Sequence, residues 1–454
     1  MFWLASGPRG AICFVLLALG AIFCSADASQ AQTPNCPTTF KHPGILTTLD
    51  DLKAVKRHIA RGDQPWKSAY DMMAGSPYAS LGYVAHPFAV VSSGVYNANA
   101  HGTFEESKDE MAAYTQALMW IFTGDERYAR NAASILDAWS STLKTHEGQN
   151  WYLQASWAGS VMPLSAELLR ATYPQWTAAE IAQFKTMLST AFLPLLHDRM
   201  AYGNRELSVI NALMAIGVFN DDPAAFCEGL THWRSYVPDY IYLSSDGPEP
   251  KRPSYMSSSP SDDALMAMDG NKFAYGNWIL AAQTVTMHGD DRTAINKWKV
   301  EQWWYRPDGP LVDGLCQETG RDLEHSELAM AATFNAAQIA WNQGIDLFTP
   351  NAARLAAFLE RSAGFRLGAP APPGLYPQGI KTDNRIFQSY EIGFDHLRHE
   401  NKIQLPLTQK LLVTVLRPVS AHYAPAPPGI VARGVTGPAS IISVWQTLTN
   451  TRGG

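Results

Sequence analysis

The feature that most constrains this chain is the regular return of helix start signals after residue 48. Thr48 and Thr177 are each followed three residues later by an acid, which is the spacing of a capping box. Asp222-Pro223 and Thr349-Pro350 each place an N-cap residue before a first-turn proline. A chain with start signals at these intervals is expected to fold into many helices.

Between these signals the apolar residues recur at helical spacing. Met111, Tyr114, Leu118 and Phe122 form one stripe, and Gly124 ends it. No alternating run rich in β-branched residues is comparable. Further helices are predicted at about 158–172, 178–197, 206–219, 223–236, 262–287, 318–343, 351–363 and 406–416.

About ten amphipathic helices joined by loops predict an all-α fold of paired antiparallel helices. The closed form expected is an (α/α) toroid, that is, an incomplete α/α barrel. No repeat of fixed period is present, which disfavours a helical solenoid. Long connections tend to line clefts, and here they are expected at 75–107, 240–261, 301–317 and 368–380.

The first residues have the pattern of a secretory signal peptide. Arg9 precedes the apolar stretch 11–23, which is short for a membrane span, and Ala28 and Ala31 offer cleavage sites. The pattern predicts a secreted or periplasmic protein with no membrane association after cleavage; an uncleaved anchor stays the alternative. The expected organisation is a signal peptide over 1–31, a toroid over 32–423 and a Pro/Gly-rich tail over 424–454.

Composition narrows the classes of partner. The chain has 35 Lys and Arg against 41 Asp and Glu, a formal charge of -6, and no basic run, so nucleic acid is not an expected partner. The 14 Trp, 18 Tyr and 18 Phe beside only 17% charged residues suit either a helical core or carbohydrate stacking. Composition does not choose between the two.

Several common kinds of site are missing from the sequence. No G-x-S-x-G, G-x-G-x-x-G, Walker A, H-E-x-x-H or EF-hand pattern occurs, so chemistry without a cofactor or metal is expected. His396 and His399 lie three apart, but a solvated polar face is favoured over a metal site. Cleavage of the signal peptide leaves Cys36, Cys227 and Cys316, which allow one disulfide with a free thiol or three buried thiols.

The densest polar cluster follows Asp313. If a helix begins near Glu318, then Arg321, Asp322 and His325 share its face, since they lie three, four and seven residues further on. That face would bring acid, guanidinium and imidazole together. A solvated first helical turn is the structural alternative.

A second cluster precedes the apolar run 209–219. Asn204 and Glu206 are expected at a helix N-terminus, where amide donors and the positive end of the dipole favour a carboxylate ligand. Plain capping by Asn204 is the alternative. Aromatic residues form a third group: a core role is favoured for Trp157, whereas the run 303–305 suits a sugar platform.

Ordered runs of sequence carry a resemblance to a known family. They are His42–Leu52 with Gln64–Trp66, Ala113–Leu118 with Thr123–Glu126 and Leu136–Trp139, Gly203–Ser208, and Val312–His325. Over about residues 42–365 the chain resembles the alginate lyase superfamily of secreted polysaccharide lyases. The resemblance implies an (α/α) toroid and cleavage of an anionic uronic-acid polysaccharide, such as alginate or glucuronan, by β-elimination without a required cofactor.

The chemistry of β-elimination assigns roles to these residues. A lyase neutralises the uronate carboxylate, removes the C5 proton and protonates the leaving O4. Asn204 and Arg321 are predicted to neutralise the carboxylate, His325 to act as the base and Tyr305 as the acid. The better-studied alginate lyases carry Asn-His where this chain has Asn204-Arg205, so His325 is the substitute for that histidine.

The other predicted site residues contact the polysaccharide. They are Glu206, Gln317, Glu318, Tyr255, Trp303, Trp304 and Trp151. Two alternatives remain at this stage. A toroidal glycoside hydrolase would use Glu206 and Glu318 as its carboxyl pair, and a non-catalytic polysaccharide-binding protein would need only the aromatic residues.

Export can be tested directly. Expression in a secretory host should yield a chain that begins at residue 29 or 32, because a signal peptidase cleaves after a small residue that follows the apolar core. Intact-mass measurement of the recovered protein decides the question. A mass that still contains Met1 to Ala26 would contradict the prediction.

Overall fold

Helices make up most of the chain that the computed structural model describes, which is residues 36–94, 99–148, 151–197, 203–247, 311–320, 322–372, 388–419 and 442–452. The all-α prediction is confirmed. The chain from Cys36 onward forms one unit. The predicted signal peptide and the helix expected at 262–287 lie outside the described residues.

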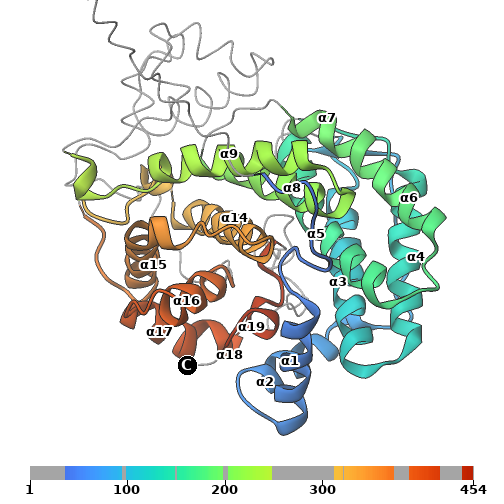
Figure 1. The fold of residues 1–454 in the computed structure, drawn as a ribbon, viewed down its shortest axis with the longest axis horizontal. Coiled ribbons are helices and arrows are strands. Elements are labelled where there is room, and N and C mark those ends of the chain that lie inside the picture. The colour runs from blue at the N-terminus through green and yellow to red at the C-terminus, as the bar shows by residue number, and fades with distance from the viewer. Residues whose placement is uncertain are drawn as a thin grey trace, which may run out of the picture. The chain divides into compact units, whose positions relative to one another are not determined.

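The elements follow one another along the chain (Figure 1). The helices are α1 (Leu49–Arg61), α2 (Trp66–Ala74), α3 (Thr103–Thr123), α4 (Glu126–Thr142), α5 (Trp151–Thr172), α6 (Ala178–Met187), α7 (Leu193–Leu196), α8 (Asn204–Asn220), α9 (Pro223–Tyr240), α14 (Leu323–Asn342), α15 (Ala352–Arg366), α16 (Tyr390–His399), α17 (Pro406–Leu411), α18 (Arg417–Val419) and α19 (Gln446–Thr449). Short 3-10 or π turns are η1 (Pro77–Ala79), η2 (Leu188–Phe192), η3 (Ser244–Asp246), η5 (Gln317–Gly320), η6 (Thr349–Asn351) and η7 (Leu412–Leu416).

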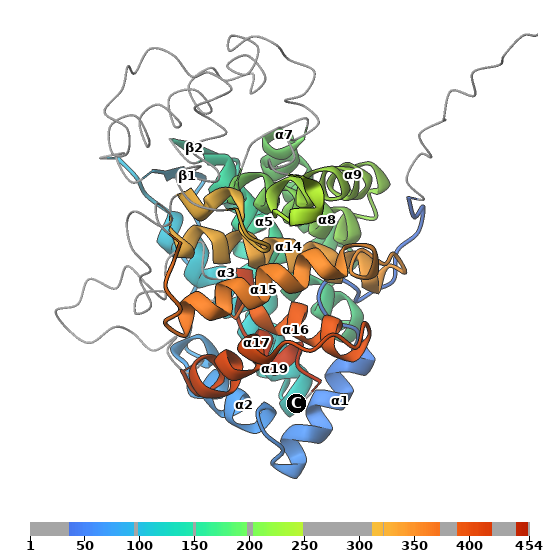
Figure 2. The same ribbon diagram turned by 90° about the vertical axis from the view of Figure 1, so that its left-hand side faces the viewer.

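The helices form an inner and an outer series. In the inner series α3 contacts α5, α5 contacts α8, α8 contacts α14, and α14 contacts α16. The outer helices α4, α9 and α15 each contact an inner neighbour. Figures 1 and 2 show α14 between α8 on one side and the α15–α16 pair on the other. This alternation of inner and outer helices is the toroidal arrangement expected from the sequence.

Sequence composition explains which helices lie inside. Every residue from Asn204 to Phe219 of α8 is buried, as is every residue from Ser326 to Ala340 of α14. A helix with apolar or small residues on all sides is most stable when other helices surround it, because every face then loses contact with water. By contrast, α4 and α6 keep exposed polar residues on their outer faces.

Short connections make neighbouring helices antiparallel. Gly124 and Asp125 join α3 to α4, and Asp221 and Asp222 join α8 to α9; in each case the two helices pack against each other. Gly124 ends α3 in the left-handed conformation, with a φ of 75°. Asp125 then accepts a hydrogen bond from the backbone of α4 as its N-cap.

Most of the predicted caps are confirmed. Thr48 and Thr177 each form a complete capping box, and Asp222 accepts hydrogen bonds from two amides of α9. The prediction at Thr349 is wrong, because Thr349–Asn351 forms a separate 3-10 turn and α15 begins at Ala352.

Two features differ from the sequence analysis. A parallel pair of four-residue strands, β1 (Val90–Ser93) and β2 (Thr145–Gly148), is too short to produce a readable alternation. His396 is not on a solvated face: it is 1% exposed, stacks on Phe348 with ring centroids 3.9 Å apart, and burial lowers its pKa to about 4.

The C-terminal residues 442–452 are not a free tail. Trp445 and Leu448 are buried, and the Trp445 indole donates to the hydroxyl of Thr115 on α3 at 2.8 Å. The Trp66 indole on α2 donates to the Thr451 carbonyl at 3.2 Å. The end of the chain therefore packs between helices from the start of the toroid. The tail predicted over 424–454 is therefore wrong for residues 442–452, where the Pro-rich sequence before them resembles a terminal linker.

The segment before α1 is anchored in two ways. Cys36 forms a disulfide with Cys227 of α9, which leaves Cys316 as the free, buried cysteine. His42 contacts Glu167 at 3.0 Å and Asp221 at 2.8 Å through its two ring nitrogens. Burial opposes protonation of His42, but the two carboxylates outweigh it and raise its pKa.

This raised pKa predicts a pH-dependent stability. The folded chain holds the His42 proton more tightly than the unfolded chain, so the contribution is full below about pH 6.5 and disappears as the pH rises through the folded pKa. His42→Gln should therefore lower the free energy of unfolding more at pH 5.5 than at pH 8.5, as measured by urea denaturation. His101→Gln is the control, because the His101 ring contacts the uncharged backbone carbonyl of Asn99 instead of a carboxylate. An equal loss at both pH values would refute the role.

None of the described helices has the length together with the apolar character that a membrane span requires.

Candidate active site at the N-terminus of helix α8

The N-terminus of α8 is set by a glycine in an unusual conformation. Gly203 has a φ of 65°, and a Cβ there would lie 2.3 Å from Glu318 Oε1. Only glycine permits both the backbone angle and the close approach of the carboxylate. The Gly203 amide donates to the Tyr236 hydroxyl at 2.5 Å and to Gln317 Oε1 at 3.1 Å.

Glu318 occupies the positive end of α8. Its Oε1 accepts from the Asn204 backbone N–H at 3.0 Å and from Asn204 Nδ2 at 2.6 Å. A carboxylate is stabilised there by the unpaired amides and the helix dipole. The alternative that Asn204 itself caps the helix is therefore wrong. The capping group is the Glu318 carboxylate of η5, and the Asn204 side chain donates to it.

The position of η5 depends on its attachment to the end of α9. Cys316 pairs with Ile241 in an antiparallel bridge, and the Tyr242 amide donates to the Leu315 carbonyl at 2.7 Å. The Cys316 thiol lies 3.3 Å from the Ser326 hydroxyl on α14. Burial raises the pKa of this thiol, so it is neutral and packs as a structural residue rather than acting as a nucleophile.

Arg205 brings a positive charge to the same place. Its side chain is buried, its Nη1 donates to the Tyr152 hydroxyl at 2.8 Å, and its guanidinium carbon lies 5.7 Å from the Tyr152 ring centroid. Tyr152 belongs to the first turn of α5. Neither Arg205 nor Tyr152 was predicted as a site residue from the sequence, although Arg205 follows Asn204 directly.

His325 is oriented by an acid but not in the expected way. Helix α14 begins at Leu323 rather than near Glu318, so the single helical face predicted for Glu318, Asp322 and His325 does not exist. Asp322 is the N-cap, and its Oδ1 lies 2.8 Å from the His325 amide and 2.7 Å from Nδ1. This contact favours the tautomer with the proton on Nδ1, which leaves Nε2 as an acceptor.

Three side chains that were predicted to contact the substrate have partners within the protein. Glu206 lies 3.1 Å from the His232 imidazole, and Glu206, Gln317 and Glu318 are at most 2% exposed. These side chains hold the N-terminus of α8 in place, and their contact with substrate stays a prediction. Trp151 is half-buried, and its ring centroid is 5.3 Å from that of Tyr152 in an edge-on contact.

Some predicted site residues cannot be placed. Tyr255, Trp303, Trp304, Tyr305 and Arg321 lie outside the described residues. Within the described ranges, no three His, Cys, Asp or Glu side chains converge in a way that suits a metal ion.

Part of the chain matches the model of a known family. Residues 66–250, which include Tyr152, Asn204 and Arg205, match the family model described as alginate lyase. The match covers less than half of the chain and supports the resemblance to the alginate lyase superfamily. No curated protein sequence matches the chain. The family match indicates the enzyme class implied by the resemblance, a polysaccharide lyase.

Solved structures of an alginate lyase are similar to this chain. A tyrosine-to-phenylalanine variant of alginate lyase A1-III in complex with a tetrasaccharide has a TM-score of 0.50 and 13% identity, with 91% of this lyase and 100% of that chain covered. Alginate lyase A1-III from Sphingomonas species A1 has a TM-score of 0.48 and 14% identity, with 81% of this lyase and 93% of that chain covered.

The capping contact of Glu318 gives a stability prediction for the lyase. Glu318→Gln keeps the shape of the side chain but removes the charge, so the free energy of unfolding should fall by about 1–2 kcal/mol in urea titrations. Glu105→Gln is the matched control, because Glu105 lies in the first turn of α3 without capping it. Equal effects of the two substitutions would contradict the proposed role of Glu318.

Proposed function

We propose that this lyase is exported and cleaves a uronic-acid polysaccharide, of the alginate or glucuronan type, by β-elimination. The observation that carries the proposal is the buried contact between the Arg205 guanidinium and the Tyr152 hydroxyl beside Asn204, at the positive end of α8. A cation, an amide and a phenol at one helix N-terminus are the groups needed by a substrate whose carboxylate must be neutralised.

The reaction has a simple balance. A base takes the proton from C5 of the uronate, a double bond forms between C4 and C5, and the C4–O4 bond breaks. The leaving O4 receives a proton, so the products are an unsaturated uronate and a new chain end. The energetic difficulty is the negative charge that develops next to the carboxylate when the C5 proton leaves.

In the proposed arrangement, Arg205 and Asn204 receive the substrate carboxylate. The Arg205 guanidinium supplies the charge, and the Asn204 amide, held by Glu318, supplies a fixed donor. Arg205 stands where the better-studied alginate lyases carry histidine, but a guanidinium stays protonated, so Arg205 can bind the carboxylate and cannot take the C5 proton. Arg321 remains a second predicted partner for the carboxylate.

Two groups are candidates for proton transfer. The Tyr152 hydroxyl accepts a hydrogen bond from the Arg205 guanidinium, which fixes its position for a proton transfer. His325 presents Nε2 as an acceptor because Asp322 contacts Nδ1. Tyr305, predicted as the acid, would then return a proton to O4.

Other observations support the substrate and the location. A similar structure was obtained with a tetrasaccharide bound, which suits an oligosaccharide substrate here. The N-terminal signal pattern and the Cys36–Cys227 disulfide both suit an oxidising compartment outside the cytoplasm.

The hydrolase alternative is less well supported. A hydrolase needs two carboxyl groups that are available to the sugar, whereas Glu318 caps α8 and Glu206 contacts His232. A hydrolase would also release products without a double bond.

The decisive experiment is incubation of the mature protein with a panel of polyuronates while the ultraviolet absorbance of the unsaturated product is followed. Tyr152→Phe should lower turnover by roughly 100-fold or more if its hydroxyl transfers a proton, and His325→Ala should do so if the imidazole is the base. Tyr83→Phe is the matched control. It also removes a hydrogen-bonded tyrosine hydroxyl, but that hydroxyl donates to Asp109 on α3 and has no part in the proposed reaction. An absence of absorbance change with every polyuronate would refute the proposal.

A further inference from the structure

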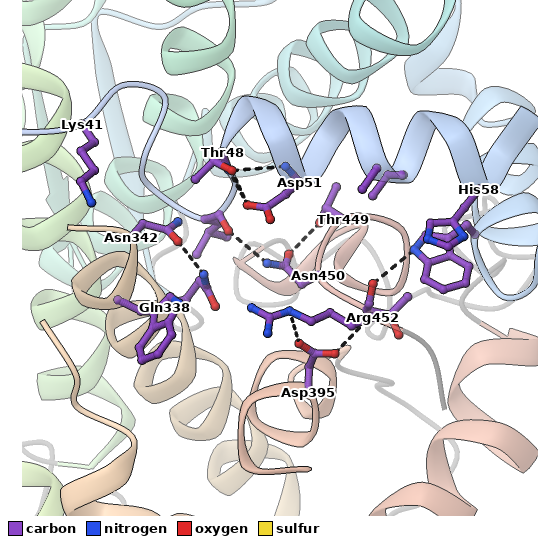
Figure 3. Close-up of a pocket in the computed structure, with 16 residues that line it drawn as sticks. Lys41, Thr48, Asp51, His58, Gln338, Asn342, Asp395, Thr449, Asn450 and Arg452 are labelled. Carbon is purple, nitrogen blue, oxygen red and sulfur yellow. Dashed lines mark hydrogen bonds and ion pairs between the residues drawn. The ribbon is translucent and has the colours of Figure 1, made fainter. Parts of the chain in front are cut away.

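A polar cavity lies where the two ends of the toroid meet. It has a volume of about 400 Å³ and is lined by residues of α1, α14 and α16 and by residues 449–452 (Figure 3). It shares no residue with the site at the N-terminus of α8. Cavities of this size hold small ligands such as one or two sugar rings.

The amide side chains in this cavity use their oxygen atoms within the protein. Gln338 Oε1 lies 2.7 Å from His396 Nε2, and Asn342 Oδ1 accepts from Gln338 Nε2 at 2.8 Å. Asn450 Oδ1 accepts from Thr449 Oγ1 at 2.7 Å. The amide acceptors are therefore occupied by neighbouring protein groups.

The amide nitrogens keep donor capacity. Asn342 Nδ2 donates to the Ile45 carbonyl at 3.0 Å and Asn450 Nδ2 to the Leu46 carbonyl at 3.1 Å. An amide nitrogen carries two hydrogens, so one remains on each of these side chains and one on Gln338 within the described structure.

Two cations add to this excess of donors. Lys41 lines the cavity, and its ammonium group makes no hydrogen bond to any described residue. Arg452 contacts Asp395 Oδ2 through Nε at 3.0 Å and Glu400 through Nη1, so further N–H groups of its guanidinium stay available. Figure 3 shows the Arg452 guanidinium directed into the cavity between Asp395 and Asn450.

The two acids of the cavity are turned toward the protein. Asp51 Oδ2 accepts from the Thr48 amide at 2.9 Å and from its hydroxyl at 2.7 Å, as part of the capping box. Asp395 is buried, accepts from the Arg452 amide at 2.8 Å, and also has His399 3.8 Å away. Burial raises the pKa of Asp395 to about 7, so its negative charge is incomplete at neutral pH.

We infer that this cavity is an accessory saccharide site that binds a single uronate unit of a chain or its end. A lining rich in unused donors and cations fits a ligand rich in acceptors, and a uronate supplies a carboxylate for Lys41 and Arg452 and ring oxygens for the amides. Trp341 also lines the cavity and offers an apolar surface for a sugar ring. The choice of a uronate rests on the proposed function, whereas the preference for an anionic sugar rests on the lining itself.

The test uses a ligand that the enzyme does not cleave. A methyl glucuronoside carries no sugar on O4 and so offers no leaving group, and a methyl glucoside is its neutral match. Titration calorimetry should show binding of the glucuronoside that Arg205→Lys leaves intact and that Lys41→Glu weakens about tenfold or more. Lys53→Glu is the matched control, because Lys53 is an exposed lysine of α1 that contacts Asp50 outside the cavity. Arg452→Gln should weaken binding in the same way, with its thermal unfolding measured to confirm folding.

Three outcomes would overturn the inference. They are equal affinity for the glucuronoside and the glucoside, equal binding by the Lys41→Glu and Lys53→Glu variants, and acetate binding as tight as that of the glucuronoside. Failure of the proposed function looks different. In that case no polyuronate yields an unsaturated product, while binding of the glucuronoside still depends on Lys41.

Discussion

The contact between the Glu318 carboxylate and the first amides of α8 is the interaction on which the site depends. It joins η5, the 3-10 turn that follows the bridge between Cys316 and Ile241, to α8, which lies more than one hundred residues earlier in the chain. Gly203 makes the approach possible because it has no side chain to displace the carboxylate. Through this contact the Asn204 amide is held in one orientation, and Arg205 on the same turn is directed to Tyr152.

The same contact has a consequence for catalysis. A carboxylate of the protein occupies the helix end where a substrate carboxylate was expected from the sequence, so the amides of α8 are not themselves the receptor. The Asn204 backbone amide holds Glu318, which in turn fixes the Asn204 side chain, and in the proposed arrangement the positive charge comes from Arg205. A preorganised donor costs no reorganisation when charge develops in the transition state, which is the usual advantage of such buried networks.

The way in which the toroid closes explains the polar cavity between its two ends. Helices α1 and α2, the C-terminal residues and helices α14 and α16 meet there, and they are joined by side-chain amides that bond to backbone carbonyls at 3.0–3.1 Å. Each of these bonds uses one hydrogen of an amide nitrogen and leaves the other directed elsewhere. The excess of donors is therefore a by-product of the way in which the two ends of the chain are held together.

Local rules of sequence were sufficient for much of this protein. Capping boxes at Thr48 and Thr177, the cap at Asp222 and the apolar stripe of α3 depend on residues within one or two turns, so helices and their all-α assembly were predictable. The runs around Asn204 and Gln317 also indicated two segments that the structure brings into contact. The family resemblance was readable for the same reason.

Contacts between distant residues were decided only by the tertiary structure. The single helical face proposed for Glu318 and His325 failed because Glu318 is drawn to α8, which ends the 3-10 turn before α14 begins. The pairing of Arg205 with Tyr152, the burial of Trp445 and the disulfide of Cys36 with Cys227 join segments 53 to 330 residues apart. No periodicity or local motif encodes such partners, because their proximity follows from how the helices pack around the toroid.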